Sequence, residues 1–171
     1  MMDIVLRKIY SQEDINRLAI LADDIWHQCF VSILTLDQID YMVDKFQSVP
    51  AMTQQIVNEG YEYYFIAMSG EEVGYTGIKK DLNKLFLSKL YLQEKYRGLG
   101  YASSALEQLK QLCIHRKLEA LWLTVNRFNK DAIAFYQKKG FETIRTQVVD
   151  IGGGYVMDDY VMELKISSFG P

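Results

Sequence analysis

The chain has 171 residues, of which 49% are apolar and 24% are charged, and its formal net charge is −3 at pH 7. This length and composition predict one soluble globular domain, residues 1–171, with a sizeable core. The weakly acidic balance argues against a nucleic-acid surface, which needs a basic face, and no apolar run approaches the roughly 18 residues of a membrane span.

Two further features concern the compartment. Cys29 and Cys113 fall in helical patterns without metal-ligand spacing, so we expect two buried free thiols in a reducing environment and no metal site. The first residues lack the basic and then apolar layout of a signal peptide. We therefore expect a cytoplasmic protein.

The beginning of the chain predicts a strand followed by helices. Ser11 and Thr35 are each followed, three positions later, by a polar partner, and both pairs resemble capping boxes. Pro50 is expected to break the chain, and Gly60 to end a helix. The expected elements are a strand over 3–9 and helices over 12–30, 36–46 and 51–58.

The middle of the chain predicts three antiparallel strands in sequence. Aromatic and branched residues fill 61–69, 73–79 and 84–92. Turn residues separate them at Gly70–Glu71 and at 81–83.

The rest of the chain predicts a helix, a central strand, a second helix and a hairpin. Residues 118–125 are almost continuously apolar, as expected of a strand covered on both faces. Asn129 is a good N-cap for a helix over 130–139, which Gly140 ends. The remaining expected elements are strands over 141–149 and 155–166 and a flexible turn over 150–154.

A short basic turn with two glycines lies between a strand pattern and a helical pattern. Gly98 and Gly100 allow a tight bend and leave no Cβ between the backbone N–H groups and a ligand. The following helix adds unpaired N–H groups and a partial positive charge, so the turn predicts an anion site, usually for phosphate. Lys95 and Arg97 add charged donors at its edge. It is not a P-loop, and Ser103 stands where a dinucleotide-binding motif has its third glycine.

Together with a second motif, this turn resembles the GNAT superfamily of acyl-CoA-dependent N-acyltransferases. That family has a Gln/Arg-x-x-Gly-x-Gly/Ala turn and later an Asn-x-x-Ala-x-x-Phe-Tyr-x-x-x-Gly-Phe motif. Here the turn reads Lys95-Tyr96-Arg97-Gly98-Leu99-Gly100, with Lys where Gln or Arg is usual. The second motif matches at Asn129, Ala132, Phe135, Tyr136, Gly140 and Phe141. The resemblance spans roughly residues 3–166.

The resemblance implies an α/β fold of the GNAT type, in which helices flank both faces of a mixed, mostly antiparallel twisted sheet of about six or seven strands. It implies an N-acetyltransferase with acetyl-CoA as its co-substrate. The expected reaction is direct transfer of the acetyl group to a primary amine, with a small molecule such as a polyamine as the acceptor.

The resemblance also assigns roles to residues. In the family, the backbone of the strand before the turn binds the pantetheine arm and the thioester carbonyl, and the turn binds the pyrophosphate. The tyrosine that matches Tyr136 is the general acid for the departing CoA thiolate, since a phenol stays protonated at neutral pH. Asn129 and Lys138 are expected on the pantetheine and the ribose phosphate; the alternatives are an N-cap role for Asn129, which is compatible with cofactor binding, and a solvated side chain for Lys138. The predicted cofactor-binding residues are Leu90, Tyr91, Leu92, Arg97, Gly98, Leu99, Gly100, Tyr101, Ala102, Ser103, Asn129, Tyr136 and Lys138.

The sequence leaves the general base open. Its candidates are Glu71, Glu72, Tyr75 and His27. Histidine has the most suitable ordinary pKa, but His27 is expected at the surface or boundary of a helix, and the two glutamates at a solvated turn.

The acceptor is equally open. Asp150, Asp158 and Asp159 on the final hairpin suit a cationic amine, and residues 152–160 resemble bacterial family members that acetylate polyamines. Since Asp158 and Asp159 are adjacent, a strand would direct them to opposite faces, and at most one would face the substrate.

Two alternative functions remain at this point. One is acetylation of a protein N-terminus or lysine, and the other is a non-catalytic acyl-CoA-binding sensor, against which Tyr136 argues. The expected partner is a small-molecule amine rather than nucleic acid or a membrane, and a homodimer is left open.

Overall fold

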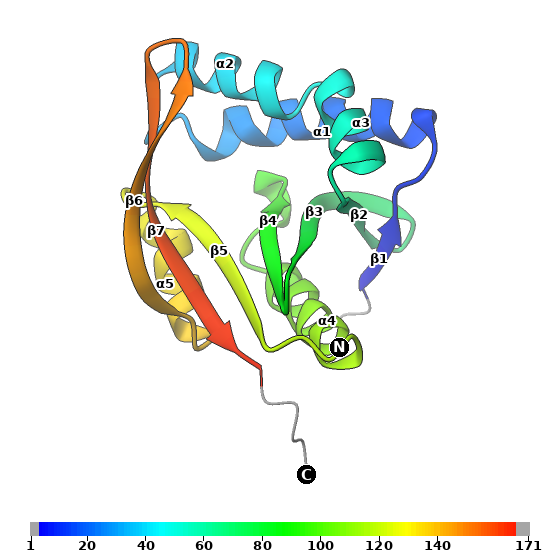
Figure 1. The fold of residues 1–171 in the computed structure, drawn as a ribbon. Helices are drawn as coiled ribbons and strands as arrows, with labels where there is room; N and C mark the ends of the chain where they lie inside the picture. Colours follow the sequence, from blue (N-terminus) through cyan, green and yellow to red (C-terminus); the bar gives the residue numbers. More distant parts are fainter. Residues whose placement is uncertain (1–3, 167–171) are drawn as a thin grey trace. The chain divides into compact units, whose positions relative to one another are not determined.

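The computed structural model describes residues 4–166, and residue 3 of the first expected strand lies outside that range. The chain folds into a mixed α/β structure (Figure 1). Its elements are β1 Ile4–Lys8, α1 Gln12–Cys29, α2 Leu36–Phe46, α3 Val49–Asn58, β2 Tyr61–Met68, β3 Glu71–Asp81, β4 Lys84–Leu92, the short 3₁₀ helix η1 Glu94–Tyr96, α4 Tyr101–His115, β5 Ala120–Asn126, α5 Lys130–Lys138, β6 Glu142–Gly152 and β7 Tyr155–Lys165. Within the described residues, no helix is both long and apolar enough to cross a membrane.

The predicted N-caps are confirmed, but the role of Pro50 is not. The side-chain oxygens of Ser11 and Thr35 accept hydrogen bonds from backbone N–H groups at 3.1 and 3.2 Å. Pro50 does not break the chain, because α3 begins at Val49 and places Pro50 in its first turn. A helix has no acceptor for the N–H groups of that turn, so a proline loses nothing there. The residue that begins α3 is Ser48, whose hydroxyl caps the amide of Ala51 at 3.3 Å.

The strands form one seven-stranded sheet in the order β1-β2-β3-β4-β5-β7-β6. The pairs β1–β2, β2–β3, β5–β7 and β6–β7 are antiparallel, and β4–β5 is parallel. This mostly antiparallel sheet, flanked by helices, confirms the predicted fold class. The final hairpin is longer than predicted: β6 continues to Gly152, and Gly153 and Gly154, both with positive φ, make the turn.

The chain divides into two compact units. Among the described residues, unit 1 comprises 4–79 and 89–109, and unit 2 comprises 80–88 and 110–166. Strand β4 and helix α4 each contribute residues to both units. The single-domain organisation stays a prediction.

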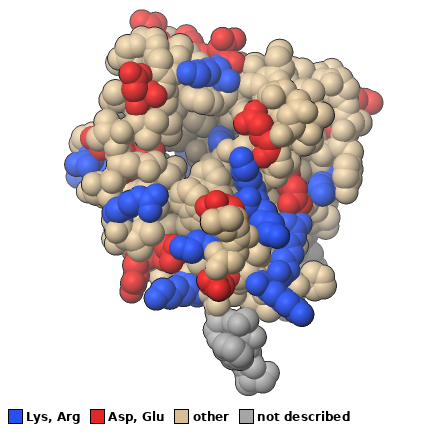
Figure 2. All heavy atoms as spheres, viewed as in Figure 1, with Lys and Arg blue, Asp and Glu red and all other residues tan. Residues whose placement is uncertain are grey.

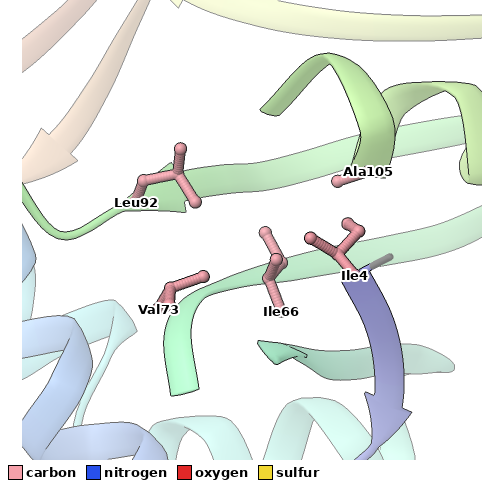
Figure 3. Packing of buried hydrophobic residues seen from close by; sticks show 5 residues of the cluster. All are labelled: Ile4, Ile66, Val73, Leu92 and Ala105. Atoms are coloured by element: carbon pink, nitrogen blue, oxygen red, sulfur yellow. The ribbon is translucent and has the colours of Figure 1, made fainter. Parts of the chain in front are cut away.

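A core cluster in unit 1 holds the end of β4 next to the start of α4. Ile4, Ile66, Val73, Leu92 and Ala105 pack together in Figure 3, and each is at most 7% exposed. Fully burying an aliphatic side chain contributes about 1.5–3 kcal/mol. Because Leu92 ends β4 and Ala105 lies in α4, this packing fixes both ends of the glycine turn between them.

Unit 2 is built around β5 and the long β6–β7 hairpin, with α5 beside it (Figure 1). Phe86 of β4 stacks on Trp122 of β5, with ring centroids 4.3 Å apart. A Cβ at Gly140, after α5, would lie 3.3 Å from the Leu164 side chain of β7. Leu164 therefore points toward the end of α5.

Both cysteines are free thiols, as expected. Cys113 is buried, and its thiol lies 3.6 Å from the Ala120 carbonyl oxygen. Cys29, expected to be buried, is only half-buried; it is the last residue of α1, and its sulfur lies against the side chain of Arg97.

Candidate functional site

The glycine turn has a defined conformation in unit 1. After β4, the Gln93 amide donates to the Val73 carbonyl at 2.9 Å, and the Arg97 amide donates to the Glu94 carbonyl at 3.2 Å. Gly98 and Gly100 then adopt φ values of 75° and 87°, in the left-handed region that strains any residue with a Cβ. Both glycines are therefore required by the shape of the backbone.

The amides that follow are free to bind a ligand. The N–H groups of residues 98–103 make no hydrogen bond among the described residues, and the first turn of α4 contains no acidic side chain. The positive end of the α4 dipole adds to these donors. These donors have the charge and hydrogen-bonding capacity that the predicted anion site needs, and the site itself stays a prediction.

The side chain of Arg97, expected as a charged donor at the edge of the anion site, contacts protein groups instead. One of its terminal nitrogens lies 3.3 Å from the Leu92 carbonyl oxygen and 2.7 Å from the Cys29 sulfur. Beside it, the Gln28 side-chain oxygen accepts from the Glu94 amide at 3.0 Å. These contacts attach the turn to the end of α1, and no sequence motif marked Gln28 or Cys29 for that role. Burial raises the pKa of the Cys29 thiol, against the opposing charge of Arg97.

A close approach of β3 shapes the end of β4. A Cβ at Gly74 would lie 2.2 Å from the Tyr91 carbonyl oxygen, a distance that no side chain can occupy. The parallel pairing of β4 with β5 is confined to Lys84–Phe86 and Ala120–Trp122. The carbonyl of Tyr91 thus packs directly against the backbone of Gly74, a close approach that the sequence reasoning missed. Its signal was a glycine inside a strand pattern.

Tyr136 lies in α5 of unit 2, on the helix that Asn129 caps by accepting from the Ala132 amide at 3.3 Å. Its ring packs edge-on against Phe135 and Phe141, with centroids 5.2 and 5.3 Å away. Its hydroxyl has no hydrogen-bond partner within residues 4–166. Burial raises the pKa of this phenol, so the hydroxyl is protonated at neutral pH. Among the described residues it donates no hydrogen bond.

The predicted cofactor-binding residues fall in both units. Those from Leu90 to Ser103 lie in unit 1, on the end of β4, the turn and the start of α4. Asn129, Tyr136 and the exposed Lys138 lie in unit 2, at or within α5. The residues within each group are close together in space, because each group comes from one short segment of the chain.

Two candidate bases, His27 and Tyr75, are held by hydrogen bonds. The His27 ring nitrogens contact the Asp23 carbonyl at 2.8 Å and the Asp40 carboxylate at 2.6 Å, and in that order these contacts raise its pKa. The Tyr75 hydroxyl lies between Trp26 and Gln47, and burial raises its pKa.

The two candidate glutamates are also engaged. Glu72 pairs with Arg7 at 2.8 Å and with Arg17. Glu71 accepts a hydrogen bond from the Tyr96 hydroxyl at 2.6 Å. Each of the four candidate bases therefore already has a hydrogen-bond or ion-pair partner.

An open groove of about 430 Å³ lies beside these glutamates in unit 1. Residues of α1, the start of β3 and η1 line it, including Arg17, Asp24, Glu72 and Lys95. Charges of both signs are interspersed in this lining, as they are over the face drawn in Figure 2. The lining of the groove therefore favours neither a cationic nor an anionic ligand.

The three acidic residues of the last hairpin differ in their surroundings. Asp150 accepts from the Gly152 amide at 2.8 Å and supports the turn. The Asp158 carboxylate lies 2.7 Å from Nε of Arg127. Asp159, its neighbour in β7, is 2% exposed and has a side-chain oxygen without a partner in the described residues. As expected for adjacent residues of a strand, Asp158 and Asp159 occupy opposite faces.

Comparisons with known proteins agree with this geometry. The sequence signature of the Acetyltransferase (GNAT) family matches residues 23–141. An uncharacterised N-acetyltransferase of Mycobacterium bovis is 35% identical over 94 residues, which cover 54% of this chain and 60% of that protein. The match thus spans less than two thirds of the relative's length.

Two solved structures share the fold. The PaiA N-acetyltransferase of Thermoplasma acidophilum, in complex with coenzyme A, has a TM-score of 0.78 and 23% identity, covering 96% of this chain and 99% of that one. The ribosomal-protein-S18-alanine N-acetyltransferase of Escherichia coli has a TM-score of 0.72 and 18% identity, covering 98% and 97%.

Proposed function

The chain belongs to the GNAT family of acetyltransferases, whose members use acetyl-CoA, and on that premise we propose that it transfers the acetyl group of acetyl-CoA to a primary amine. The observation that carries this proposal is the row of unpartnered amides at residues 98–103, at the positive end of α4. Such a row matches the pyrophosphate of coenzyme A in charge and in hydrogen-bonding capacity.

The same segment supports the rest of the cofactor assignment. The backbone of Leu90–Leu92 leads directly into the turn, and Gly74 leaves room for β3 to approach it closely. We assign the pantetheine arm and the thioester carbonyl to this backbone. Asn129 and Lys138 are assigned to the pantetheine and the ribose phosphate, with polar groups of the right type on α5.

We assign the general-acid role to Tyr136. The CoA thiolate leaves with a pKa well above 7 and gains from a proton donor. Tyr136 supports the role because its hydroxyl is protonated at neutral pH and has no partner among the described residues.

For the acceptor we favour a small cationic amine such as a polyamine. The net charge of −3 and the resemblance of residues 152–160 to polyamine-acetylating family members support this choice. The alternative is a protein N-terminus or lysine, and one fold neighbour is named for acetylating ribosomal protein S18. A non-catalytic acyl-CoA sensor is the third reading, and the free hydroxyl of Tyr136 weighs against it.

Release of free thiol from acetyl-CoA, followed with a panel of amines, tests this proposal. The panel contains spermidine, spermine, putrescine, free lysine and a short peptide with an unblocked N-terminus, and mass spectrometry identifies the acetylated product. We expect spermidine or spermine to accelerate thiol release. Preference for the peptide would support the protein-acetylating alternative, and tight coenzyme A binding without thiol release from any amine would support the sensor.

A further inference from the structure

The carboxyl group of Asp159 is buried without a partner of its own. Asp159 is 2% exposed, and its Oδ1 accepts no hydrogen bond from the described residues. A buried charge that lacks a partner is strongly unfavourable in a folded protein. Burial, followed by the charge of Asp158, raises the pKa of Asp159 from 3.8 to about 6. Nothing in the fold of unit 2 compensates for this placement.

The strand register defines what surrounds Asp159. It lies in β7, the strand between β5 and β6 (Figure 1), opposite Asn126 of β5 and Gln147 of β6. Directly opposite residues share a face of the sheet. The side chains beside Asp159 are therefore two neutral amides, which can hydrogen-bond a ligand but cannot neutralise a charge.

That face is turned away from α5. Leu164 points toward the end of α5, and β7 pairs with β5 in an unbroken register from residue 159 to 165. Side chains alternate along a strand, so Asp158 shares the face of Leu164 and Asp159 takes the other. Arg127 consequently pairs with Asp158 and not with Asp159.

The remaining charged groups on the Asp159 face lie further along the strands. Arg145 of β6 is opposite Val161 and is exposed, and Glu163 of β7 pairs with Lys84 of β4 at 2.8 Å. Glu142, opposite Glu163, and Lys165 at the end of β7 are also exposed. No basic side chain forms an ion pair with Asp159 within residues 4–166. The cation that this carboxylate lacks is not supplied by unit 2.

We propose that Asp159 binds the ammonium group of the acceptor and takes its proton, so that Asp159 is the general base of the acetyl transfer. This inference rests on the proposed function, since it assumes an amine substrate. It also explains the placement of the residue, because a substrate ammonium provides both the missing hydrogen-bond donor and the missing positive charge.

The resulting reaction balances in atoms and charge. The Asp159 carboxylate removes one proton from R–NH₃⁺, and the lone pair of the neutral amine forms a C–N bond to the thioester carbonyl carbon. The C–S bond then breaks, and the CoA thiolate takes the proton of Tyr136. The second amine proton returns to the Tyr136 oxygen through water, and Asp159 releases its proton to solvent. Each turnover yields the amide, free coenzyme A and one proton.

The test compares Asp159→Asn with Asp158→Asn, a matched control one residue away whose carboxylate already pairs with Arg127. We expect Asp159→Asn to lower kcat/KM for spermidine on the order of 10²-fold or more and to abolish the loss of activity that the wild type shows below about pH 6. Acetyl-CoA affinity, measured by calorimetry, should not change in either variant. Asp158→Asn should stay within about twofold of the wild type.

A weakly basic amine separates proton transfer from simple binding. Trifluoroethylamine is largely neutral at pH 7.5 and needs no base, so Asp159→Asn should lose much less activity with it than with spermidine. An equal loss with both amines, or wild-type kcat/KM in Asp159→Asn, would overturn the assignment. If Asp159→Asn does not fold, the wild type decides, because a kcat/KM that is independent of pH between 5 and 8 would overturn it too.

Failure of the proposed function gives a different result. Wild-type protein that releases no thiol with any amine would refute both proposals. Wild-type activity together with an unaffected Asp159→Asn variant would refute the base alone.

Discussion

Two polar regions of this chain differ in whether their groups have partners. In unit 1, Nε1 of Trp26 donates to the Tyr75 hydroxyl at 2.8 Å, and that hydroxyl donates to Oε1 of Gln47 at 2.8 Å. In unit 2, the hydroxyl of the half-buried Tyr136 and the buried Oδ1 of Asp159 have no partner among the described residues. An unpaired buried polar group costs about 1–3 kcal/mol, so the placement of Asp159 needs an explanation other than stability.

The pKa values alone would not separate these regions. Burial raises the pKa of Tyr75 and of Tyr136, so both phenols are protonated at neutral pH. The difference is that the Tyr75 proton is already donated to Gln47, whereas the Tyr136 proton is available. Removing each hydroxyl should therefore affect stability in the first case and catalysis in the second.

The largest expected effect is on turnover in Tyr136→Phe. Loss of one general-acid proton transfer lowers kcat on the order of 10²-fold, or about 2.7 kcal/mol of transition-state stabilisation. The effect should appear in kcat, because the proton is needed only as the thiolate leaves. Steady-state kinetics measures it, and calorimetry should show unchanged acetyl-CoA affinity. Wild-type kcat in this variant would remove Tyr136 from the mechanism.

Tyr75→Phe should have the opposite profile. It leaves the Trp26 N–H and the Gln47 oxygen without their shared partner, which should lower the free energy of unfolding by about 2 kcal/mol. For a chain of this size we expect Tm to fall by about 4–8 °C in a thermal melt. Tyr10→Phe is the matched control, because Tyr10 is 75% exposed. A large fall in kcat at unchanged Tm would contradict the structural role of Tyr75.

The sequence predicted the local features of the fold much better than the long-range ones. Caps such as Ser11 and Asn129 act within a few residues, so their patterns are visible in the sequence and were confirmed. Pro50 was misread because a proline ends a helix or begins one, depending on which neighbour caps it. The Trp26–Tyr75–Gln47 network joins three separate segments, and no spacing rule reveals such a contact.

The features of the candidate site also divide into local ones, which the sequence predicted, and long-range ones, which it did not. The turn at Gly98 and the helix of Tyr136 follow from short motifs, and their assigned roles stay predictions. The engagement of Arg97 by Cys29 and the close approach at Gly74 depend on residues far apart in sequence. The isolation of Asp159 is also a three-dimensional property, since it requires knowing that Arg127 lies on the other face of β7.

A third region sharpens the comparison, because the amides of residues 98–103 are unpartnered but not buried. Gly98→Ala places a residue with a Cβ at a φ of 75°, a conformation that costs about 1–2 kcal/mol. If the turn shifts to relieve that strain, acetyl-CoA affinity should fall about tenfold, corresponding to about 1.4 kcal/mol. Calorimetric titration measures this.

Two variants serve as controls for Gly98→Ala. Gly98→Asn tolerates the left-handed region better and should lose less affinity unless the Cβ itself clashes with the cofactor. Gly70→Ala meets a similar strain, at a φ of 82°, in the turn between β2 and β3. Gly70→Ala should reduce stability without changing acetyl-CoA affinity, and equal losses of affinity in both alanine variants would argue against a phosphate site at Gly98.

The smallest expected effect is a gain in stability in Asp159→Asn, and its sign depends on pH. The folded-state pKa of about 6 lies above the ordinary value of 3.8, so the folded protein holds this proton more tightly than the unfolded chain does. The buried charge therefore has no cost below about pH 4, and its cost grows through this window and is complete above about pH 6. Asparagine removes the charge but leaves a buried amide to satisfy, so we expect a net gain of about 1 kcal/mol at pH 7.5 and none at pH 4. Urea unfolding at both pH values measures it.

Asp158→Asn should instead lose up to about 1 kcal/mol at pH 7.5, because it breaks a half-exposed ion pair with Arg127. If Asp159→Asn is destabilised at pH 7.5 as much as at pH 4, the carboxylate has a structural partner and the contrast between the two regions fails. If it is more stable but inactive with spermidine, the chain keeps an unfavourable charge because the reaction requires it.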